Sequence, residues 1–246
     1  MTNNTAPYHN LALIYDRMMS HVDYRGWRDY ILQIIKASGG SVESLVDLSC
    51  GTGNLLGFFK GKIRNLAGCD YSQQMIQIAS GKKVLSTIPL FINDVTEMAI
   101  GAGQVDCALF LYDSLNYITE TDALGKFFSE VKQILKINGM FLFDVVTIRH
   151  CREYYADFHE SEFWGDEGYS RHSYFDRKKS EQHNDFRIVV RGNTFEERHI
   201  QKIYKQSDLE KMLTRCGFHI HAMYDEFTLD AAGKESGRIH FLCIKK

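Results

Sequence analysis

This sequence has little proline, no long apolar run and no large surplus of one charge. Its 246 residues include only 2 prolines, and a chain of this length can bury one large domain with room for a small insertion. No apolar run approaches the roughly 18 residues that a membrane span needs. The polar residues 1–7 lack the apolar core of a signal peptide. We therefore expect a soluble, cytoplasmic protein without a membrane partner.

The balance of charge argues against a nucleic-acid partner. Lys and Arg number 29 against 31 Asp and Glu, whereas a surface that follows phosphates normally carries a basic excess. The six cysteines form no C-x-x-C pair, which indicates reduced thiols and neither disulfides nor a zinc site. Four histidines show no common metal-ligand spacing, so we expect no metal. They are His159, His172, His183 and His199.

The chain is organised around one stretch, residues 45–56. The apolar run 45–48 predicts a buried strand, and a helix-permissive segment begins at Asn54. Between them lies a turn that contains Gly51 and Gly53. Glycine has no side chain to keep a cofactor away from the backbone, so this layout favours cofactor binding.

Two acidic residues indicate which cofactor the turn binds. Asp47 lies four residues before Gly51, and Asp70 ends the next apolar run. A carboxylate at that strand tip can accept both ribose hydroxyls of an adenosine cofactor. A dinucleotide fingerprint would need a third glycine at the position of Leu56, and Gly57 comes one residue late. S-adenosylmethionine (SAM), which has no pyrophosphate, is therefore favoured over a nicotinamide dinucleotide.

The segment from Asp47 to Gly53 resembles the D-x-x-x-G-x-G cofactor loop of the class I SAM-dependent methyltransferases. It departs from that loop at Ser49, where glycine is commonest. The resemblance extends from Tyr8 to Lys246 and is weakest between residues 150 and 204.

The resemblance implies SAM as the cofactor and a set of residues that hold it. Tyr8, Ala12, Tyr15 and Asp16 fit an N-terminal helix that closes over the pocket in related small-molecule enzymes, although the tyrosines could equally pack at an interface. Asp94 would accept the adenine amino group, or else be a solvated strand end. Met75 would lie against the adenine, or else belong to the core. The full cofactor set is Tyr8, Tyr15, Asp47, Cys50, Gly51, Gly53, Asp70, Tyr71, Met75, Asp94, Val95 and Leu111.

The methyl acceptor is expected beyond the strand 105–113, because ligands bind outside the carboxyl ends of strands in open α/β sheets. The substrate-facing residues implied by the resemblance are Ser114, Asn116, Tyr117 and Tyr204. If the acceptor must lose a proton, Asp113 or His199 would act as the base.

The predicted fold is α/β, with a Rossmann-like, seven-stranded mixed sheet flanked by helices and a small antiparallel β insertion. We assign residues 1–149 and 206–246 to the SAM-binding domain. Residues 150–205 form the insertion, interpreted as a substrate lid, with a dimer contact or a solvated flap as the alternatives. Within these boundaries we expect one helix through 151–158, a hairpin turn at Gly192 and Asn193, and a capping box at 207–210.

The predicted function is transfer of a methyl group from SAM to a nitrogen or oxygen of a small molecule. A SAM-binding regulator without activity and a methyltransferase acting on a macromolecule remain open. A nicotinamide-dependent oxidoreductase is disfavoured by Leu56. The acceptor itself, and whether the protein is a monomer or a homodimer, stay undetermined.

Overall fold

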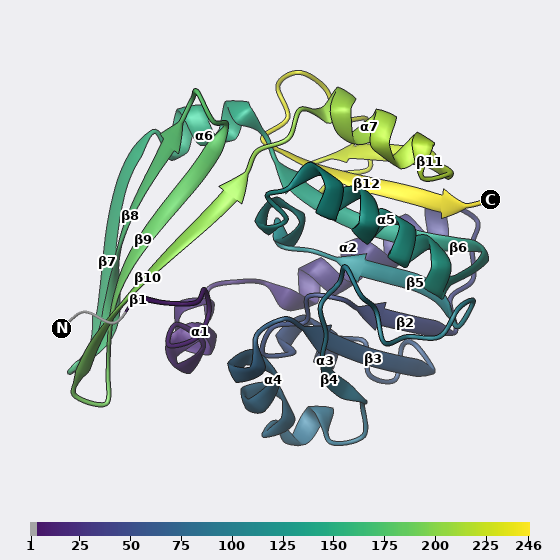
Figure 1. Cartoon of the computed structure of the whole chain (residues 1–246). Coiled ribbons are helices and arrows are strands. Elements are labelled where there is room, and N and C mark those ends of the chain that lie inside the picture. The colour runs from purple at the N-terminus through teal and green to yellow at the C-terminus, as the bar shows by residue number, and fades with distance from the viewer. Residues whose placement is uncertain (1–3) are drawn as a thin grey trace.

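The computed structural model describes residues 4–246 as two β-sheets joined by helices (Figure 1). The larger sheet has seven strands in the order β11-β12-β6-β5-β2-β3-β4. Its strands are β2 (Ser44–Asp47), β3 (Asn65–Asp70), β4 (Leu90–Ile92), β5 (Val105–Phe110), β6 (Leu135–Val146), β11 (Phe218–Asp225) and β12 (Arg238–Lys245). The helices are α1 (Ala12–Met18), α2 (Tyr24–Ala37), α3 (Asn54–Phe58), α4 (Gln73–Ser80), α5 (Thr121–Ile134), α6 (Ile148–Tyr154) and α7 (Gln206–Arg215), with 3-10 turns η1 (Lys83–Leu85) and η2 (Ser114–Tyr117).

The topology of the larger sheet confirms the predicted fold class. Strands β4, β3, β2, β5 and β6 run parallel, and β12 and β11 complete the sheet as an antiparallel hairpin. The order of the parallel strands reverses at β2, which pairs with β3 on one side and β5 on the other. Such a switch point opens a crevice at the carboxyl ends of these strands, where α/β proteins bind their ligands.

Apolar side chains fill both faces of the larger sheet. On one face, α2 packs Trp27 and Ile34 into a cluster with Leu142 and Leu242. On the other, aromatic rings of α5 meet rings of β6 and β12 in a second cluster that includes Phe127. This double covering explains why strands such as β5 are apolar almost throughout. Within residues 4–246, the structure contains no helix whose length and apolarity would allow it to cross a membrane.

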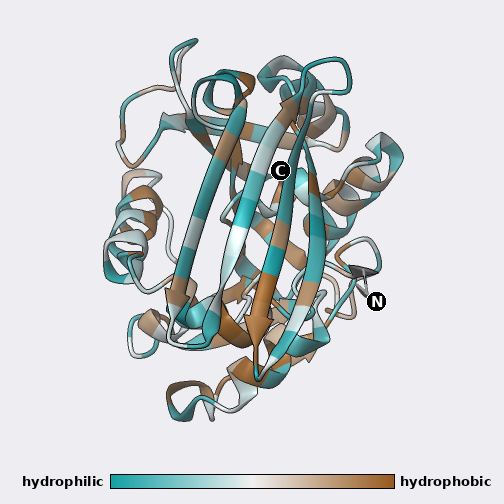
Figure 2. Ribbon diagram, turned by 90° about the vertical axis from the view of Figure 1, so that its left-hand side faces the viewer, coloured by the Kyte–Doolittle hydropathy of each residue, from teal (hydrophilic) through white to brown (hydrophobic). Residues whose placement is uncertain are grey.

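The smaller sheet is formed mainly by the insertion and has the order β1-β10-β9-β8-β7. It comprises β1 (Asn4–Thr5), β7 (Asp157–Trp164), β8 (Glu167–Asp176), β9 (Glu181–Val190) and β10 (Asn193–Lys202). The four insertion strands are antiparallel to one another, and β1 runs parallel to β10. Figure 2 looks onto this sheet and shows hydrophilic and hydrophobic residues mixed along each strand.

The pairing of β1 with β10 attaches the N-terminal residues to the insertion sheet. The predicted boundary placed residues 1–149 with the larger sheet, but the backbone of Asn4 and Thr5 pairs with Glu196 and Glu197 of the insertion. The chain then passes into α1, which contacts α4 beside the larger sheet. Residues 4–18 therefore connect the two sheets, and we call this segment the strap.

Three local predictions need correction. The helix expected through 151–158 ends at Tyr154, and Phe158 lies in β7, where its pattern of alternate partly buried residues continues through the strand. The hairpin turn is Arg191-Gly192, because both residues have positive φ and Asn193 already pairs with Val190.

The third correction concerns the start of α7. The predicted capping box at 207–210 does not form, since α7 begins at Gln206 and its N-cap Lys205 makes no side-chain cap bond. Gln206 donates instead to Glu210 at 2.8 Å. By contrast, Ser72 caps α4, accepting from the Met75 N–H.

Candidate cofactor and acceptor site

A cavity of about 1040 Å³ lies at the carboxyl ends of β2, β3 and β5. It takes in the glycine turn, the strap and the beginning of η2 and α5. Most of the residues predicted to contact cofactor or acceptor line this one cavity. They are Tyr8, Tyr15, Asp47, Cys50, Gly51, Asp70, Tyr71, Met75, Asp94, Val95, Leu111, Ser114 and Tyr117.

The two glycines of the turn serve different purposes. Gly51 has φ +54, and a Cβ added there would meet nothing nearer than the Met75 sulfur at 4.0 Å, so the backbone lies bare toward the cavity. Gly53, also predicted to contact the cofactor, does not line the cavity. It has φ +77, and an added Cβ would come within 2.3 Å of Leu85. Gly53 is thus required by the turn and by the packing of η1, not by a ligand.

Two carboxylates form the polar floor of the cavity, Asp47, which is buried, and Asp70, which is half-buried. Asp70 accepts from the Gly51 N–H at 2.9 Å and from the Ser72 N–H at 2.8 Å. Burial raises the pKa of Asp70, although these backbone donors act in the opposite direction. Burial also raises the pKa of Asp47, to about 7, with one N–H from Ser49 acting against it.

These carboxylates fit the cofactor that the sequence predicts. A buried carboxylate with a raised pKa gains most from a cationic ligand, because the cation offsets the cost of ionising it. SAM carries both a sulfonium and an ammonium group. The bare backbone at Gly51 and the adjacent Asp70 leave room for an adenosine unit at the switch point.

The strap covers the cavity with tyrosines. The rings of Tyr8 and Tyr15 meet edge to face with centroids 5.9 Å apart. Asp16 fastens α1 to the glycine turn, accepting from Thr52 at 2.5 Å and from Asn54 at 2.9 Å. The predicted pattern that contains Tyr8, Tyr15 and Asp16 therefore lies in a segment that covers the cavity.

The far wall carries Met75 and Asp94, the residues predicted to face adenine, together with Tyr71. Met75 is buried, whereas Tyr71 is 75% exposed at the mouth. The exposed Asp94 carboxylate accepts from both the N–H and the hydroxyl of Thr96, each at 2.8 Å. One of its oxygens therefore already has protein partners.

Three residues predicted near the acceptor lie outside the cavity lining. The side chain of Asn116 is fully buried, because η2 turns it toward the Lys202 carbonyl, to which it donates at 2.7 Å. Tyr204 donates to the Ile118 carbonyl at 2.5 Å. Asp113, predicted as a base, is held by Arg238 at 2.9 Å and by Gln201 at 2.5 Å.

The second predicted base, His199, stands behind the cavity wall. Its Nδ1 lies 3.0 Å from the Tyr117 hydroxyl, which lies 2.8 Å from the Tyr8 hydroxyl. Its Nε2 lies 3.2 Å from Glu197. His199 and Glu197 are 1% and 2% exposed, so the cavity meets this chain of groups only through the two tyrosines.

The partners fix the direction of the hydrogen bonds in this chain. Burial would raise the pKa of Glu197, but hydrogen bonds from His199 and from the Asn10 and Leu11 N–H groups outweigh it and lower the pKa. An ionised carboxylate only accepts, so the His199 Nε2–H donates to Glu197. In the neutral imidazole, Nδ1 then accepts from the Tyr117 hydroxyl, which in turn can accept from Tyr8.

Sequence reasoning missed Tyr112, another residue of the wall. Its ring stacks on Trp27 with centroids 4.4 Å apart. Tyr112 and Asp113 both have positive φ, +59 and +49, an uncommon conformation for such residues. Backbone of this kind is concentrated at binding sites, but only the position of Tyr112 after a strand could have indicated it.

Comparison with known proteins supports the fold and the activity. Residues 45–139 match a family model described as a methyltransferase domain. The crystal structure of a SAM-dependent methyltransferase from Clostridium acetobutylicum ATCC 824 matches with a TM-score of 0.82 and 27% identity, over 97% of this chain and 98% of that one. The chain is a SAM-dependent methyltransferase.

Two further relatives extend over nearly the whole methyltransferase. The Bacillus subtilis (strain 168) protein named "Putative methyltransferase YqeM" is 29% identical over 97% of both chains. The SAM-bound structure of CalS10, an amino pentose methyltransferase from Micromonospora echinaspora, matches with a TM-score of 0.75 over 95% of this chain and 97% of that one. At 14% identity, that likeness shows the fold alone. The cofactor of this methyltransferase is SAM, as predicted.

Proposed function

We propose that this methyltransferase transfers the methyl group of SAM to an amine or hydroxyl of a small polar molecule, with an amine favoured. The volume of the cavity supports a small acceptor. At about 1040 Å³, it is at the upper limit of the roughly 300–1,000 Å³ typical of small-ligand pockets, so cofactor and acceptor can share it. A Streptomyces venezuelae relative named as a dTDP-3-amino-3,4,6-trideoxy-alpha-D-glucopyranose N,N-dimethyltransferase, 25% identical over 118 residues, favours nitrogen.

The residues that would hold SAM are those of the floor and the strap. Asp70 would accept from the ribose hydroxyls, Asp47 would face the cationic methionine end, and Tyr8 and Tyr15 would cover the sulfonium with electron-rich rings. When bound, SAM supplies an electrophilic methyl group. The protein's own contribution is to position the acceptor and to exclude water.

The observation that carries the proposal is the chain of groups from Tyr8 through Tyr117 and His199 to Glu197. An amine or hydroxyl acceptor must lose a proton when it gains a methyl group. That proton would pass to the oxygen of Tyr117, whose own proton moves to Nδ1 of His199. Glu197 would stabilise the resulting imidazolium. His199 thus keeps the predicted role of a base, but acts through Tyr117.

The insertion would then act from behind the wall and not as a direct lining of the acceptor pocket. None of residues 150–205 lines the cavity. The insertion instead places Glu197 against three N–H groups of the strap, those of Tyr8, Asn10 and Leu11, at 2.9, 2.5 and 3.2 Å. We therefore assign the insertion the role of holding the strap and the proton acceptor.

The decisive experiment is a methyl-transfer screen. The purified protein is incubated with SAM and a panel of small amines, with hydroxyl analogues of the same carbon skeletons, and methylated products are detected by mass spectrometry. We expect turnover of an amine, faster than that of its hydroxyl analogue. Asp70→Asn serves as the cofactor-deficient control.

The outcome separates the three functions that the sequence left open. SAM binding without turnover of any small acceptor, combined with methylation of protein or RNA, would replace the proposal with a macromolecular substrate. SAM binding without any methylation would leave a SAM-binding regulator.

A further inference from the structure

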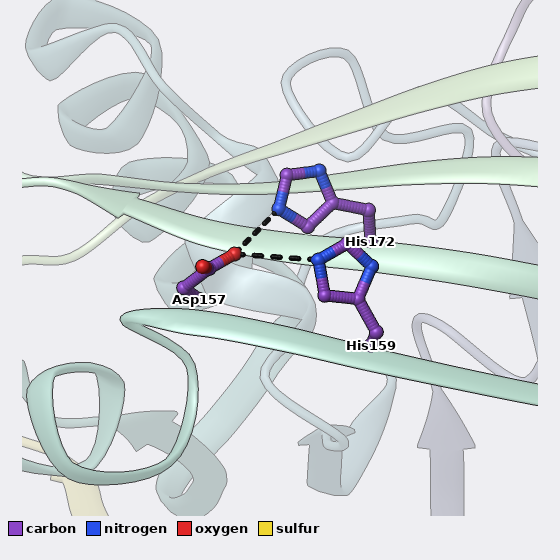
Figure 3. A group of neighbouring side chains, drawn as sticks. All are labelled: Asp157, His159 and His172. Atoms are coloured by element: carbon purple, nitrogen blue, oxygen red, sulfur yellow. Dashed lines mark hydrogen bonds and ion pairs between the residues drawn. The ribbon is translucent and has the colours of Figure 1, made fainter.

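Two histidines and an aspartate meet on the insertion sheet (Figure 3). The strand register places them on the outer face, opposite the face from which His199 contacts Tyr117. Nε2 of His172 lies 2.9 Å from Oδ1 of Asp157, and Nε2 of His159 lies 3.4 Å from the same oxygen. One ligand atom from each residue falls within 4.8 Å of the others. The two imidazole rings are parallel, with centroids 4.1 Å apart and an interplanar angle of 2°.

The sheet itself creates this arrangement. His159 of β7 pairs directly with His172 of β8, and directly opposed side chains in antiparallel strands lie about 4.5–5.5 Å apart. Asp157 is two residues before His159, which places it on the same face of β7. Linear spacing gave no sign of a metal site because the two histidines are brought together by strand register and not by a short motif.

We propose that Asp157, His159 and His172 bind one divalent transition-metal ion, with Zn²⁺ the best fit. Zn²⁺ takes imidazole nitrogen and carboxylate oxygen at about 2.0–2.2 Å in tetrahedral geometry, so its ligand atoms lie about 3.3–3.5 Å apart. The distances of 2.9 and 3.4 Å between Asp157 and the two rings lie close to that separation. Two imidazoles and one carboxylate suit zinc better than magnesium or calcium.

The surroundings give the ion access to the three side chains. They also leave a fourth coordination position free. His159 and His172 border a groove of about 770 Å³ on this face. Asp157 and His159 are exposed, so water can complete the coordination.

The bound ion would fasten β7 to β8. β7 is an edge strand of the sheet, and edge strands are exposed to pairing with other chains. A cross-strand metal ion would hold this edge in register, and because it binds only the folded sheet it would raise the stability of the protein. This role is independent of methyl transfer.

The test is titration of the full-length protein, freed of any histidine tag, with Zn²⁺ by calorimetry and with Co²⁺ by visible absorption. We expect one site per chain, a higher thermal midpoint with Zn²⁺, and a Co²⁺ spectrum of nitrogen and oxygen ligands without a thiolate band. His159→Gln and His172→Gln should each weaken the site at least about tenfold. The matched control is His221→Gln, since His219 and His221 form a histidine pair on β11 with centroids 6.4 Å apart.

The proposal is overturned if Zn²⁺ fails to bind up to millimolar concentration. It is equally overturned if the two glutamine variants bind as the wild type does, or if the Co²⁺ spectrum is that of a cysteine site. A loss of binding in His221→Gln alone would move the site to β11. Circular dichroism of each variant without metal establishes that the sheet is folded in every comparison.

Discussion

The two sheets of this methyltransferase bury different kinds of side chain. In β5 and β6 the buried positions are almost all apolar and cover both faces. In β9 and β10 five of the eight buried positions of the inner face are polar, namely Gln182, Asn184, Glu197, His199 and Gln201, and the other three pack in a small apolar cluster with Leu11 and Ile14. The larger sheet therefore builds a core, while the smaller one presents hydrogen-bonding groups to its neighbour.

This difference shows where the smaller sheet acts. A buried polar group is costly unless it is hydrogen-bonded. Glu197 meets that condition by binding the strap, and His199 by binding Tyr117. The sheet that carries no cofactor loop thus positions two tyrosines of the cofactor cavity. The following changes test that division of labour, beginning with the largest expected effect.

Tyr117→Phe should lower kcat by about 10²–10⁴, the usual contribution of general acid–base catalysis, while SAM affinity changes by less than about 0.7 kcal/mol. The phenyl ring keeps the wall but breaks the connection between acceptor and His199. Steady-state kinetics and calorimetry measure the two quantities. The control is Tyr204→Phe, because Tyr204 does not line the cavity and its hydroxyl donates to the backbone carbonyl of Ile118; its rate should stay near wild type. Equal rates for the two variants would remove Tyr117 from the reaction.

Asp70→Asn should weaken SAM by about 1.5–3 kcal/mol, the range for hydrogen bonds to a charged group. The matched control is Asp106→Asn at the other end of the larger sheet, where hydrogen bonds from Lys136 and Ser44 outweigh burial and lower the pKa of Asp106 to about 2. That variant should lose stability and keep its SAM affinity. Calorimetry on both, after a thermal melt, distinguishes the sites. Full SAM affinity in folded Asp70→Asn would contradict the ribose assignment.

Glu197→Gln should weaken SAM about tenfold, close to 1.4 kcal/mol. The amide loses the charge that strengthens the bonds to Tyr8, Asn10 and Leu11, so the strap detaches more often. Glu196→Gln, at the exposed neighbouring position, is the control. If Glu197→Gln binds SAM as the wild type does, the two sheets act independently.

The smallest effect is a change of SAM affinity with pH. Asp47 has a pKa of about 7 in the fold against an ordinary 3.8, so the folded protein holds its proton more tightly than the unfolded chain. Stability from this group therefore falls as pH rises from about 4 to 7. Cationic SAM favours the ionised form, so its affinity should rise about fivefold between pH 6 and pH 7 and then level off.

Calorimetry in buffers of different ionisation enthalpy should detect release of about one proton on SAM binding near pH 6. Asp47→Asn should abolish that release. Proton release that is unchanged in this variant would assign it to another group, with Asp70 the nearest candidate because burial raises its pKa as well.

The cofactor floor could be predicted from the sequence because each of its residues lies at the end of a predicted strand or shortly after it. Asp47, Gly51 and Asp70 follow strand ends, and parallel topology brings strand ends together. The proton acceptor could not be assembled in this way, since Tyr117 and His199 meet only through the docking of two sheets. Asn116 was misplaced for a related reason: its position after β5 is correct, but η2 turns its side chain away from the cavity.

The hydrogen bonds between Glu197 and the strap also have a consequence for the kinetics of the enzyme. One carboxylate, that of Glu197, holds the N–H groups of Tyr8, Asn10 and Leu11 as well as a histidine, so the strap detaches as a unit and not residue by residue. Entry of SAM and departure of its demethylated product then share one opening event. Where such an opening step limits turnover, viscous solvents and low temperature reduce kcat without altering the chemistry at Tyr117.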